Sequence, residues 1–83
     1  MWAFVKWLDT TSIEEPWASP EDSKALRPLA VITVGKVLHR NDEYITVAGS
    51  VGLEDVEYGD VTCIPQGCIE KIINLEEPDH VET

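Results

Sequence analysis

Residues 29–48 read LAVITVGKVLHRNDEYITVA, and this stretch decides the fold. Valine, isoleucine and threonine dominate it, and β-branched side chains fit a pleated strand better than a helix. The letters RNDE at residues 40–43 are typical of a turn, because Asn and Asp tolerate left-handed backbone and hydrogen-bond to their own main chain. The stretch therefore predicts a β-hairpin, two strands joined by a tight polar turn, around which the rest of the chain folds.

The first strand of this hairpin is apolar on both faces. In an extended chain its alternate residues form two rows: Leu29, Val31, Thr33 and Val37 in one, and Ala30, Ile32, Val34 and Leu38 in the other. A strand of this kind is central, strongly curved or partly covered by a neighbouring subunit. Gly35 interrupts the run, and a glycine inside a strand marks a bulge, a bend or a close backbone approach. We expect Gly35 to bend the strand so that it belongs to both halves of a small sheet.

Three further segments are predicted to be strands. Residues 2–8 and 58–64 have strand composition, and residues 65–67 (PQG) stop the second of them with a short turn or a single 3₁₀ step. Residues 68–75 (CIEKIINL) match both helix and strand spacing. We favour a strand there, because so short a segment makes a marginal helix.

A short helix is predicted between the first strand and the hairpin. Ser19 is a good N-cap, Pro20 suits the first helical position, and the acidic residues that follow favour the first turn. The helix must be short, because an Arg-Pro pair soon ends it. We expect about two turns over residues 19–26, lying across one end of the sheet with Ala25 and Leu26 facing inward.

Together these segments predict a mainly β protein, a small five-stranded SH3-like or Sm-like barrel with one short helix between the first and second strands. The chain has 83 residues and is predicted to be a single domain over residues 1–75, followed by an acidic flexible tail over residues 76–83. A domain of this size buries only roughly 60–65% of its unfolded surface, so we expect copies of the chain to associate as a homo-oligomer.

The charge balance narrows the possible partners. The chain has 16 acidic and 6 basic residues, a formal net charge of −10. Nucleic acids and anionic membranes attract lysine and arginine, so this balance argues against both as partners. It favours a soluble chain, a basic protein partner or mimicry of nucleic acid charge, and a solvated acidic surface is the simplest explanation.

The sequence also indicates a compartment. No signal peptide and no run of about 20 apolar residues is visible, which argues against secretion and a membrane span. The chain has two cysteines, and they need not pair. We therefore expect a soluble protein in a reducing cytoplasm.

No pattern of residues points to catalysis or to a cofactor. The sequence contains no nucleophile elbow, P-loop, dinucleotide fingerprint or metalloprotease motif, so we expect no enzyme activity. Cys63 and Cys68, with His39 or His80, lack the paired spacing of a zinc site, and we expect Cys63 to be a small core residue. The acidic residues at 54–60 lack the alternating ligands and the central glycine of a calcium loop.

Trp17 and a basic cluster are candidate binding residues. Trp17 stands beside a proline and the helix cap, and it is either a core residue or an exposed contact. Lys36, His39 and Arg40 form the one basic cluster of the acidic chain. They are either the solvent face of the hairpin or a local pocket for a phosphate or carboxylate.

An acidic loop is the other candidate site. Residues 49–57 contain two glycines and a run of acidic residues, which is typical of a loop. Its length makes it the segment in which we expect function, with Glu54, Asp55 and Glu57 as candidate partner-binding residues.

Two stretches resemble the Sm/LSm family of small barrels. Residues 34–37 (VGKV) and 41–47 (NDEYITV) resemble the first Sm motif, a glycine and an apolar residue followed by an acidic turn and an apolar strand. Residues 64–72 (IPQGCIEKI) resemble the apolar spacing of the second motif. The resemblance implies a barrel that forms rings. The RNA-contacting Asn of the family falls near Ile45 and the basic residue of its second motif at Pro65, and these departures argue against RNA binding.

The layout of the chain is also similar to that of short tailed-phage proteins. The shared pieces, in order, are residues 7–9 (WLD), 17–22 (WASPED), 34–37 (VGKV) and 64–65 (IP). This similarity implies a phage accessory protein made in the cytoplasm of the bacterial host. Such proteins include inhibitors of host defence that bind a host protein or sequester a nucleotide signal.

We therefore expect a non-enzymatic, homo-oligomeric phage protein that inhibits a host defence or another host protein through an acidic surface. The first alternative is an oligomeric sponge that captures a small nucleotide at subunit junctions, using Trp17, Lys36, His39 and Arg40. The second alternative is a structural component of the virion.

Overall fold

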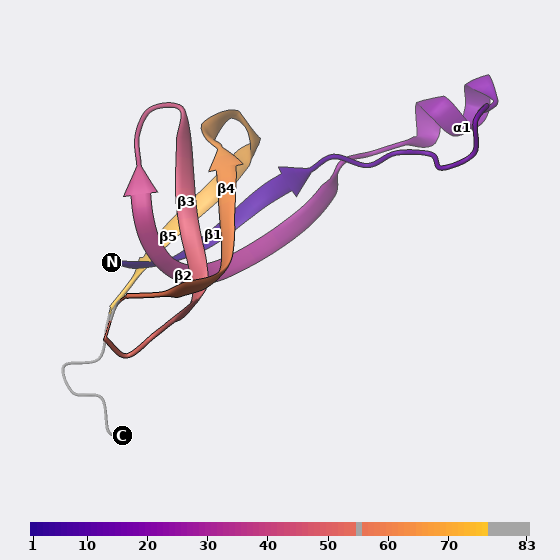
Figure 1. Cartoon of the computed structure of the whole chain (residues 1–83). Helices are drawn as coiled ribbons and strands as arrows, with labels where there is room; N and C mark the ends of the chain where they lie inside the picture. Colours follow the sequence, from indigo (N-terminus) through magenta and orange to yellow (C-terminus); the bar gives the residue numbers. More distant parts are fainter. Residues whose placement is uncertain (55, 77–83) are drawn as a thin grey trace.

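The computed structural model describes residues 1–54 and 56–76. Its elements are, in order, β1 (Trp2–Asp9), α1 (Pro20–Ala25), β2 (Leu29–Arg40), β3 (Tyr44–Val51), β4 (Tyr58–Pro65), the 3₁₀ turn η1 (Gln66–Cys68) and β5 (Ile69–Leu75). The strands form one antiparallel sheet in the order β4-β3-β2-β1-β5 (Figure 1). The prediction of a mainly β chain with one short helix between the first two strands is confirmed. No ladder joins β4 to β5 among the described residues, so the sheet is open at both edges.

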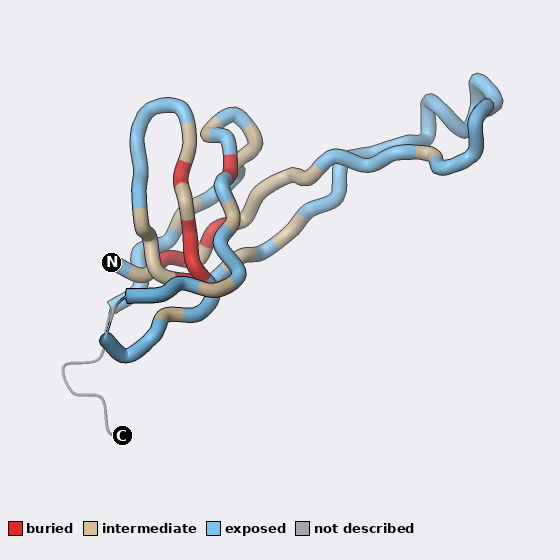
Figure 2. The backbone as a smooth tube through the Cα atoms, viewed as in Figure 1, coloured by how far each residue is buried: buried red, intermediate tan, exposed pale blue. Residues whose placement is uncertain are grey.

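One face of the curved sheet encloses the hydrophobic core (Figure 2). The fully buried residues of the core cluster come from β1, β3 and β4: Ala3, Val5, Ile45, Val47 and Ile64. Partly buried side chains pack around them: Trp7, Val37, Cys68, Ile69 and Ile72. Trp7 Nε1 donates a hydrogen bond of 3.0 Å to Thr33 Oγ1, which satisfies the single polar atom of that side chain. Burial of each large aliphatic side chain stabilises the fold by about 1.5–3 kcal/mol.

The register of the strands assigns residues to an inner and an outer face of the sheet. Ala3 and Val5 pair with Gly35 and Thr33 on the inner face. The alternate residues of each strand point to the other side, because directly paired residues of antiparallel strands share a face. We call that surface the outer face. Its residues, strand by strand from β5 to β4, include Lys71, Ile73, Leu75, Trp2, Phe4, Lys6, Leu8, Ala30, Ile32, Val34, Lys36, Thr46, Ala48, Val61 and Cys63, of which Ala48 is fully buried.

Cys63 lies on the opposite side of its strand from the one expected. Cys63 pairs with Thr46 and is exposed, whereas Cys68 packs against the core. The prediction that Cys63 is a core residue is therefore wrong. The pairing of Ile64 with Ile45 places Ile64 in the core, and strand alternation then turns Cys63 outward.

Gly35 lies at the point where β3 passes closest to β2. Gly35 is buried, and a Cβ built on it would lie 2.1 Å from the carbonyl oxygen of Ala48. Two residues further on, β2 carries a bulge between Val37 and His39, where its pairing with β3 shifts. Of the three alternatives given for Gly35, a bulge, a bend or a close backbone approach, the structure has the close approach, and no side chain fits there.

The helix does not lie across an end of the sheet. β1 and β2 remain paired as far as Asp9 and Leu29, and the connection between them projects away from the core (Figure 1). The molecule therefore measures 55 × 22 × 21 Å along its principal axes. No residue of α1 is buried and Leu26 is 40% exposed, so the prediction that Ala25 and Leu26 face inward is wrong. The paired strands carry both ends of the connection beyond the core, so the helix has no apolar surface of the sheet within reach.

The structure also defines the start of the acidic loop, the segment at residues 68–75 and the described end of the chain. β3 continues to Val51, so the acidic loop begins at residue 52 rather than 49. The ambiguous segment at residues 68–75 is the end of η1 followed by the strand β5, and the preference for a strand is confirmed. Of the predicted tail, residues 77–83 lie outside the described residues.

In the described part of the chain, no helix has the length and apolar character needed to cross a membrane.

Gly35→Ala is expected to destabilise the fold, because the added carbon would meet the Ala48 carbonyl oxygen at 2.1 Å and would push β2 and β3 apart. Overpacking of this kind lowers the free energy of unfolding by about 1–3 kcal/mol. Gly67→Ala is the matched control, since nothing lies within 4 Å of its Cβ position, and its stability should change by less than about 1 kcal/mol. Urea unfolding measures both variants, and equal stabilities would contradict the close approach.

Candidate functional site

The connection between β1 and β2, residues 10–28, forms a projecting segment that we call the arm (Figure 1). Its two halves are joined by a hydrogen bond of 2.7 Å from Thr11 Oγ1 to the carbonyl oxygen of Arg27. At its root, Thr10 N donates a hydrogen bond of 2.8 Å to Asp9 Oδ1. Near its end, the partly buried Ile13 lies beside Leu26. Contacts within the arm thus hold its shape without help from the sheet.

The helix of the arm is capped at both ends. Ser19 Oγ accepts a hydrogen bond of 3.1 Å from Asp22 N, so the predicted N-cap is confirmed. At the other end, Arg27 Nη1 donates hydrogen bonds of 2.7 Å and 2.9 Å to the carbonyl oxygens of Lys24 and Leu26. These side chains satisfy backbone groups that a six-residue helix leaves unpaired, which explains why it forms without burying any residue.

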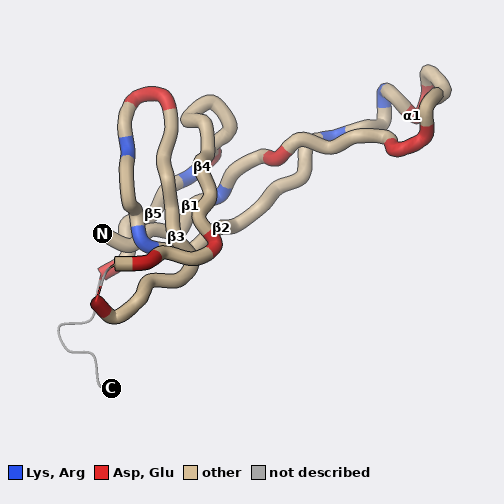
Figure 3. The backbone as a smooth tube through the Cα atoms, viewed as in Figure 1, with Lys and Arg blue, Asp and Glu red and all other residues tan. Residues whose placement is uncertain are grey.

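Trp17 is the most exposed large apolar residue among those described. Its exposed fraction is 91%, so Trp17 is not a core residue. Four exposed acidic residues of the arm lie near it in the sequence: Glu14, Glu15, Glu21 and Asp22. The arm therefore presents an aromatic side chain in a negatively charged setting (Figure 3).

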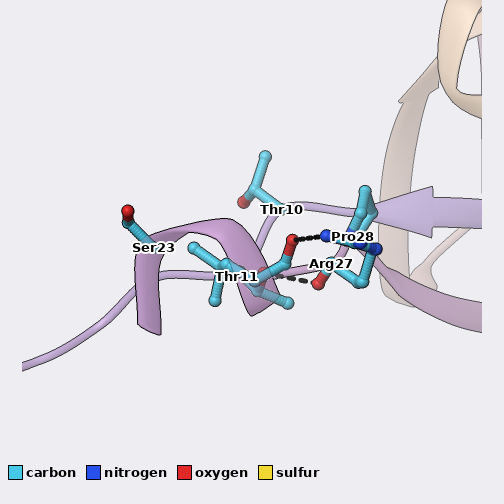
Figure 4. Close-up of a pocket in the computed structure, with 6 residues that line it drawn as sticks. Thr10, Thr11, Ser23, Arg27 and Pro28 are labelled. Carbon is cyan, nitrogen blue, oxygen red and sulfur yellow. Dashed lines mark hydrogen bonds between the residues drawn. The ribbon is translucent and has the colours of Figure 1, made fainter. Parts of the chain in front are cut away.

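A shallow depression of about 350 Å³ lies at the root of the arm (Figure 4). Its lining residues are Thr10, Thr11, Ser23, Leu26, Arg27 and Pro28. All of them are exposed, and Arg27 Nη1 already donates to two backbone carbonyls. The depression is therefore open to solvent and offers a ligand little enclosure.

The predicted basic cluster lies on the sheet, away from Trp17. Lys36 is on the outer face opposite Trp2, and His39 and Arg40 follow the bulge at the exposed end of β2. The His39 ring lies 5.6 Å from the Tyr44 ring, centroid to centroid. The arm and the β2–β3 turn project from different sides of the sheet (Figure 1). A single chain therefore does not bring Trp17 to the three basic residues.

The acidic loop, residues 52–57, exposes apolar as well as acidic side chains. Leu53 and Val56 are 83% and 75% exposed. Glu54 and Glu57 are also exposed, and the loop is closed by a hydrogen bond of 2.9 Å from Gly52 N to the carbonyl oxygen of Glu57. Asp55, the third acidic residue predicted for this site, lies outside the described residues. The structure thus adds Leu53 and Val56, which sequence reasoning missed because two isolated aliphatic residues in a loop carry no periodic signal.

Acidic and basic residues both lie along the arm and along the strands (Figure 3). Asp and Glu lie in the arm, where Lys24 and Arg27 accompany them, in the β2–β3 turn, in the acidic loop and in strands β1, β4 and β5. The outer face carries Lys6, Lys36 and Lys71, and the Glu70 carboxylate reaches Lys6 from the register shift of β5. Lys6 Nζ lies 3.4 Å from Glu70 Oε2, and both side chains are half exposed. That these lysines of three strands share one face is invisible in the sequence, because it depends on the register of β5, β1 and β2.

The described residues offer no metal centre. No group of three or more His, Cys, Asp or Glu side chains among them has the geometry to hold an ion. Cys63 and Cys68 are both free thiols. His80, the other histidine weighed as a zinc ligand, lies outside the described residues.

Comparison with known proteins does not assign a family. No protein-family model, no curated protein and no solved structure matches the chain. The candidate sites therefore rest on the geometry of the arm, the acidic loop and the outer face.

Ser19→Ala is expected to loosen the arm without weakening the sheet. The substitution removes the side-chain acceptor of Asp22 N, and loss of an N-cap costs about 1 kcal/mol of helix stability, or about fivefold faster amide exchange. Because no α1 residue is buried, the unfolding midpoint of the sheet should not move. NMR hydrogen exchange at Asp22 and Ser23, with the Ile45 amide as internal control, measures this. A lowered midpoint with unchanged exchange at Asp22 would contradict it.

Proposed function

We propose that this chain is a non-enzymatic accessory protein of a bacteriophage that inhibits a host protein through an acidic, partly apolar surface. The observation that carries the proposal is the acidic loop, in which Leu53 and Val56 are 83% and 75% exposed beside Glu54 and Glu57. Exposed apolar surface is unfavourable in water by about 25 cal/mol per Å². Neighbouring exposed aliphatic residues rimmed by charge are typical of a surface that a partner covers.

The charges of the loop indicate the chemistry of that partner. Among the described residues, no lysine or arginine lies within 4 Å of Glu54 or Glu57, and Glu70 is the acid in the described ion pair. A partner that brings basic side chains to the loop gains electrostatic attraction, which speeds its association and fixes its orientation. The aliphatic side chains then contribute affinity by leaving water.

The phage origin, the location in the host cytoplasm and the finer fold assignment are parts of the same proposal. The order of the sequence pieces at residues 7–9, 17–22, 34–37 and 64–65 supports the first two. An Sm-like, SH3-like barrel is supported by the order β4-β3-β2-β1-β5 with only η1 between the two edge strands. A five-stranded sheet that curves until its edges approach becomes a small barrel.

Reversing the charge of the loop is expected to abolish capture of the host partner. In pull-downs from a bacterial lysate, wild-type chain should retain a basic protein that Glu54→Lys/Glu57→Lys loses, because like charges would then meet. The matched control is Asp42→Lys/Glu43→Lys, which makes the same charge change in the β2–β3 turn and should retain the protein. Retention should weaken steeply between 50 and 500 mM salt, on the order of tenfold or more. Equal retention by both variants, or binding that salt does not weaken, would refute the proposal.

Capture of a small nucleotide between copies of the chain is a second candidate function. It is favoured by the 91% exposure of Trp17, which offers a stacking surface, and by the cationic Lys36, His39 and Arg40 on the sheet. Since one chain holds these groups apart, the site requires two copies.

If this second function operates, cyclic nucleotides or ADP-ribose derivatives should raise the melting temperature. At 100 times Kd the stabilisation is about 2.7 kcal/mol, equivalent to several degrees for a domain of this size. Trp17→Ala should remove the shift and Trp17→Phe should preserve part of it, because a phenyl ring still stacks. No shift with any nucleotide in a thermal-shift screen would exclude this function.

A further inference from the structure

The arm buries almost none of its surface. Among residues 10–28, Ile13 is partly buried and every other residue is exposed. Hydrogen bonds within the arm give it its shape, but they leave its apolar side chains, above all Trp17, in water. Fixing a residue in one backbone conformation costs entropy, and a hydrogen bond within reach of water offsets little of that cost. A surface that covered the arm would therefore stabilise it.

An aromatic side chain and a depression lie at opposite ends of the arm. Trp17 is near the middle of the segment and so near its far end, and it is 91% exposed. The depression of about 350 Å³ lies at the root of the arm, close to the sheet (Figure 4). Leu26 and Pro28 give it an apolar lining, which suits a large aromatic ring.

Arg27 gives the depression a specific contact for such a ring. Its Nη1 donates hydrogen bonds of 2.7 Å and 2.9 Å to the carbonyl oxygens of Lys24 and Leu26, which fix the guanidinium at an exposed position. A guanidinium stacks on the face of an indole, and the attraction grows when the contact is removed from water. Because Trp17 of the same arm lies at the other end, its ring can reach this contact only in another copy.

The charges of the arm favour an antiparallel pairing of two arms (Figure 3). The basic residues Lys24 and Arg27 lie on the returning half of the arm, nearer to the sheet. Asp9, an acid at the root, accepts a hydrogen bond from Thr10 N. Two arms that lie side by side and point in opposite directions therefore bring the acidic end of each to the basic residues of the other. The acidic residues that flank the far end are Glu14, Glu15, Glu21 and Asp22.

The accessible area of the chain is large enough for a stable interface. It is 6546 Å², whereas a compact monomer of this mass exposes about 5,000 Å². Half of the difference is close to the roughly 800 Å² that each partner of a standard interface buries. Since residues 10–28 are exposed along their whole length, the arm is a major source of this excess.

We propose that two copies of this chain form a dimer through their arms, which pack antiparallel with Trp17 of each copy in the depression of the other. The same contact then occurs twice about a twofold axis, so the assembly closes as a dimer. The arm keeps its shape through its own hydrogen bonds, which lowers the entropy lost on pairing.

The experiment places one defect on each side of the contact. Trp17→Glu removes the ring, and Thr10→Glu puts a carboxylate into the depression, where it meets the acidic end of the other arm. Both positions are exposed, so circular dichroism should show an unchanged sheet. Should Thr10→Glu alter the spectrum, Pro28→Glu replaces it in the same depression.

Two control variants make the same kind of change elsewhere. Leu53→Glu alters an 83% exposed position of the acidic loop, and Ile32→Glu alters a 58% exposed position of the outer face. Both should associate like wild type. The second control tests the alternative in which copies pack through their outer faces.

Sedimentation equilibrium over a range of concentrations measures the association. Wild type and both controls should reach the mass of two chains of 9.3 kDa, and Trp17→Glu and Thr10→Glu should each associate at least tenfold more weakly. An equimolar mixture of these two variants should associate more tightly than either alone, because one of the two contacts is then intact. Acrylamide quenching gives a second readout: quenching of tryptophan fluorescence should increase on dilution of wild type, and Trp17→Phe should lose most of that increase.

Four outcomes would overturn the proposal. They are a wild-type chain that stays at 9.3 kDa, a Trp17→Glu variant that associates like wild type, a mixture no tighter than its components, and a loss of association in Ile32→Glu. Trp17 is covered in this dimer, so a nucleotide-induced rise in melting temperature that depends on Trp17 would also count against it. The test is separate from that of the acidic loop, because Glu54→Lys/Glu57→Lys should lose the host partner and keep the mass of the dimer.

Discussion

The central constraint in this protein is that β2 is apolar on both faces while the chain has residues for only one layer of sheet. The inner row of β2 is covered because the sheet curves around the core of Val5, Ile45 and Ile64. That curvature requires β3 to pass within contact distance of the β2 backbone at Gly35. Nothing in residues 1–54 and 56–76 covers the outer row at Ile32 and Val34, which remain exposed. Within one chain, the fold therefore buries the inner row of β2 and leaves the outer row exposed.

The sequence predicted those features that depend on the conformation of a few neighbouring residues. They are the turn at residues 40–43, the glycine at 35 inside a strand and the Ser19 N-cap of the helix. The position of the helix and the side on which Cys63 lies were predicted wrongly. Both depend on strand register, the first on the ladder that reaches Asp9 and Leu29, the second on the pairing of β3 with β4. Register is set by contacts between distant residues, which composition and periodicity do not report.

Some candidate site residues could be found from composition, and others depend on strand register. Composition picked out Trp17 and the acidic loop, because a tryptophan beside a helix cap and a run of acids are conspicuous in a short chain. Composition also grouped Lys36 with His39 and Arg40, which are close in sequence. The structure instead aligns Lys36 with Trp2 on the outer face, where Lys6 and Lys71 also lie. A surface assembled from three strands becomes visible only when their register is known.

The uneven distribution of charge lets a chain with a net charge of −10 present different surfaces to a partner. A uniform negative surface would repel a second copy at every orientation. Here Lys6, Lys36 and Lys71 lie on the outer face, with Glu70 beside Lys6, whereas the acidic loop combines acidic with exposed aliphatic residues. Long-range repulsion is screened beyond about 8 Å at physiological salt, so the local pattern decides which surfaces can meet. That pattern makes the acidic loop, where Leu53 and Val56 are exposed beside Glu54 and Glu57, the surface that suits a partner of opposite charge.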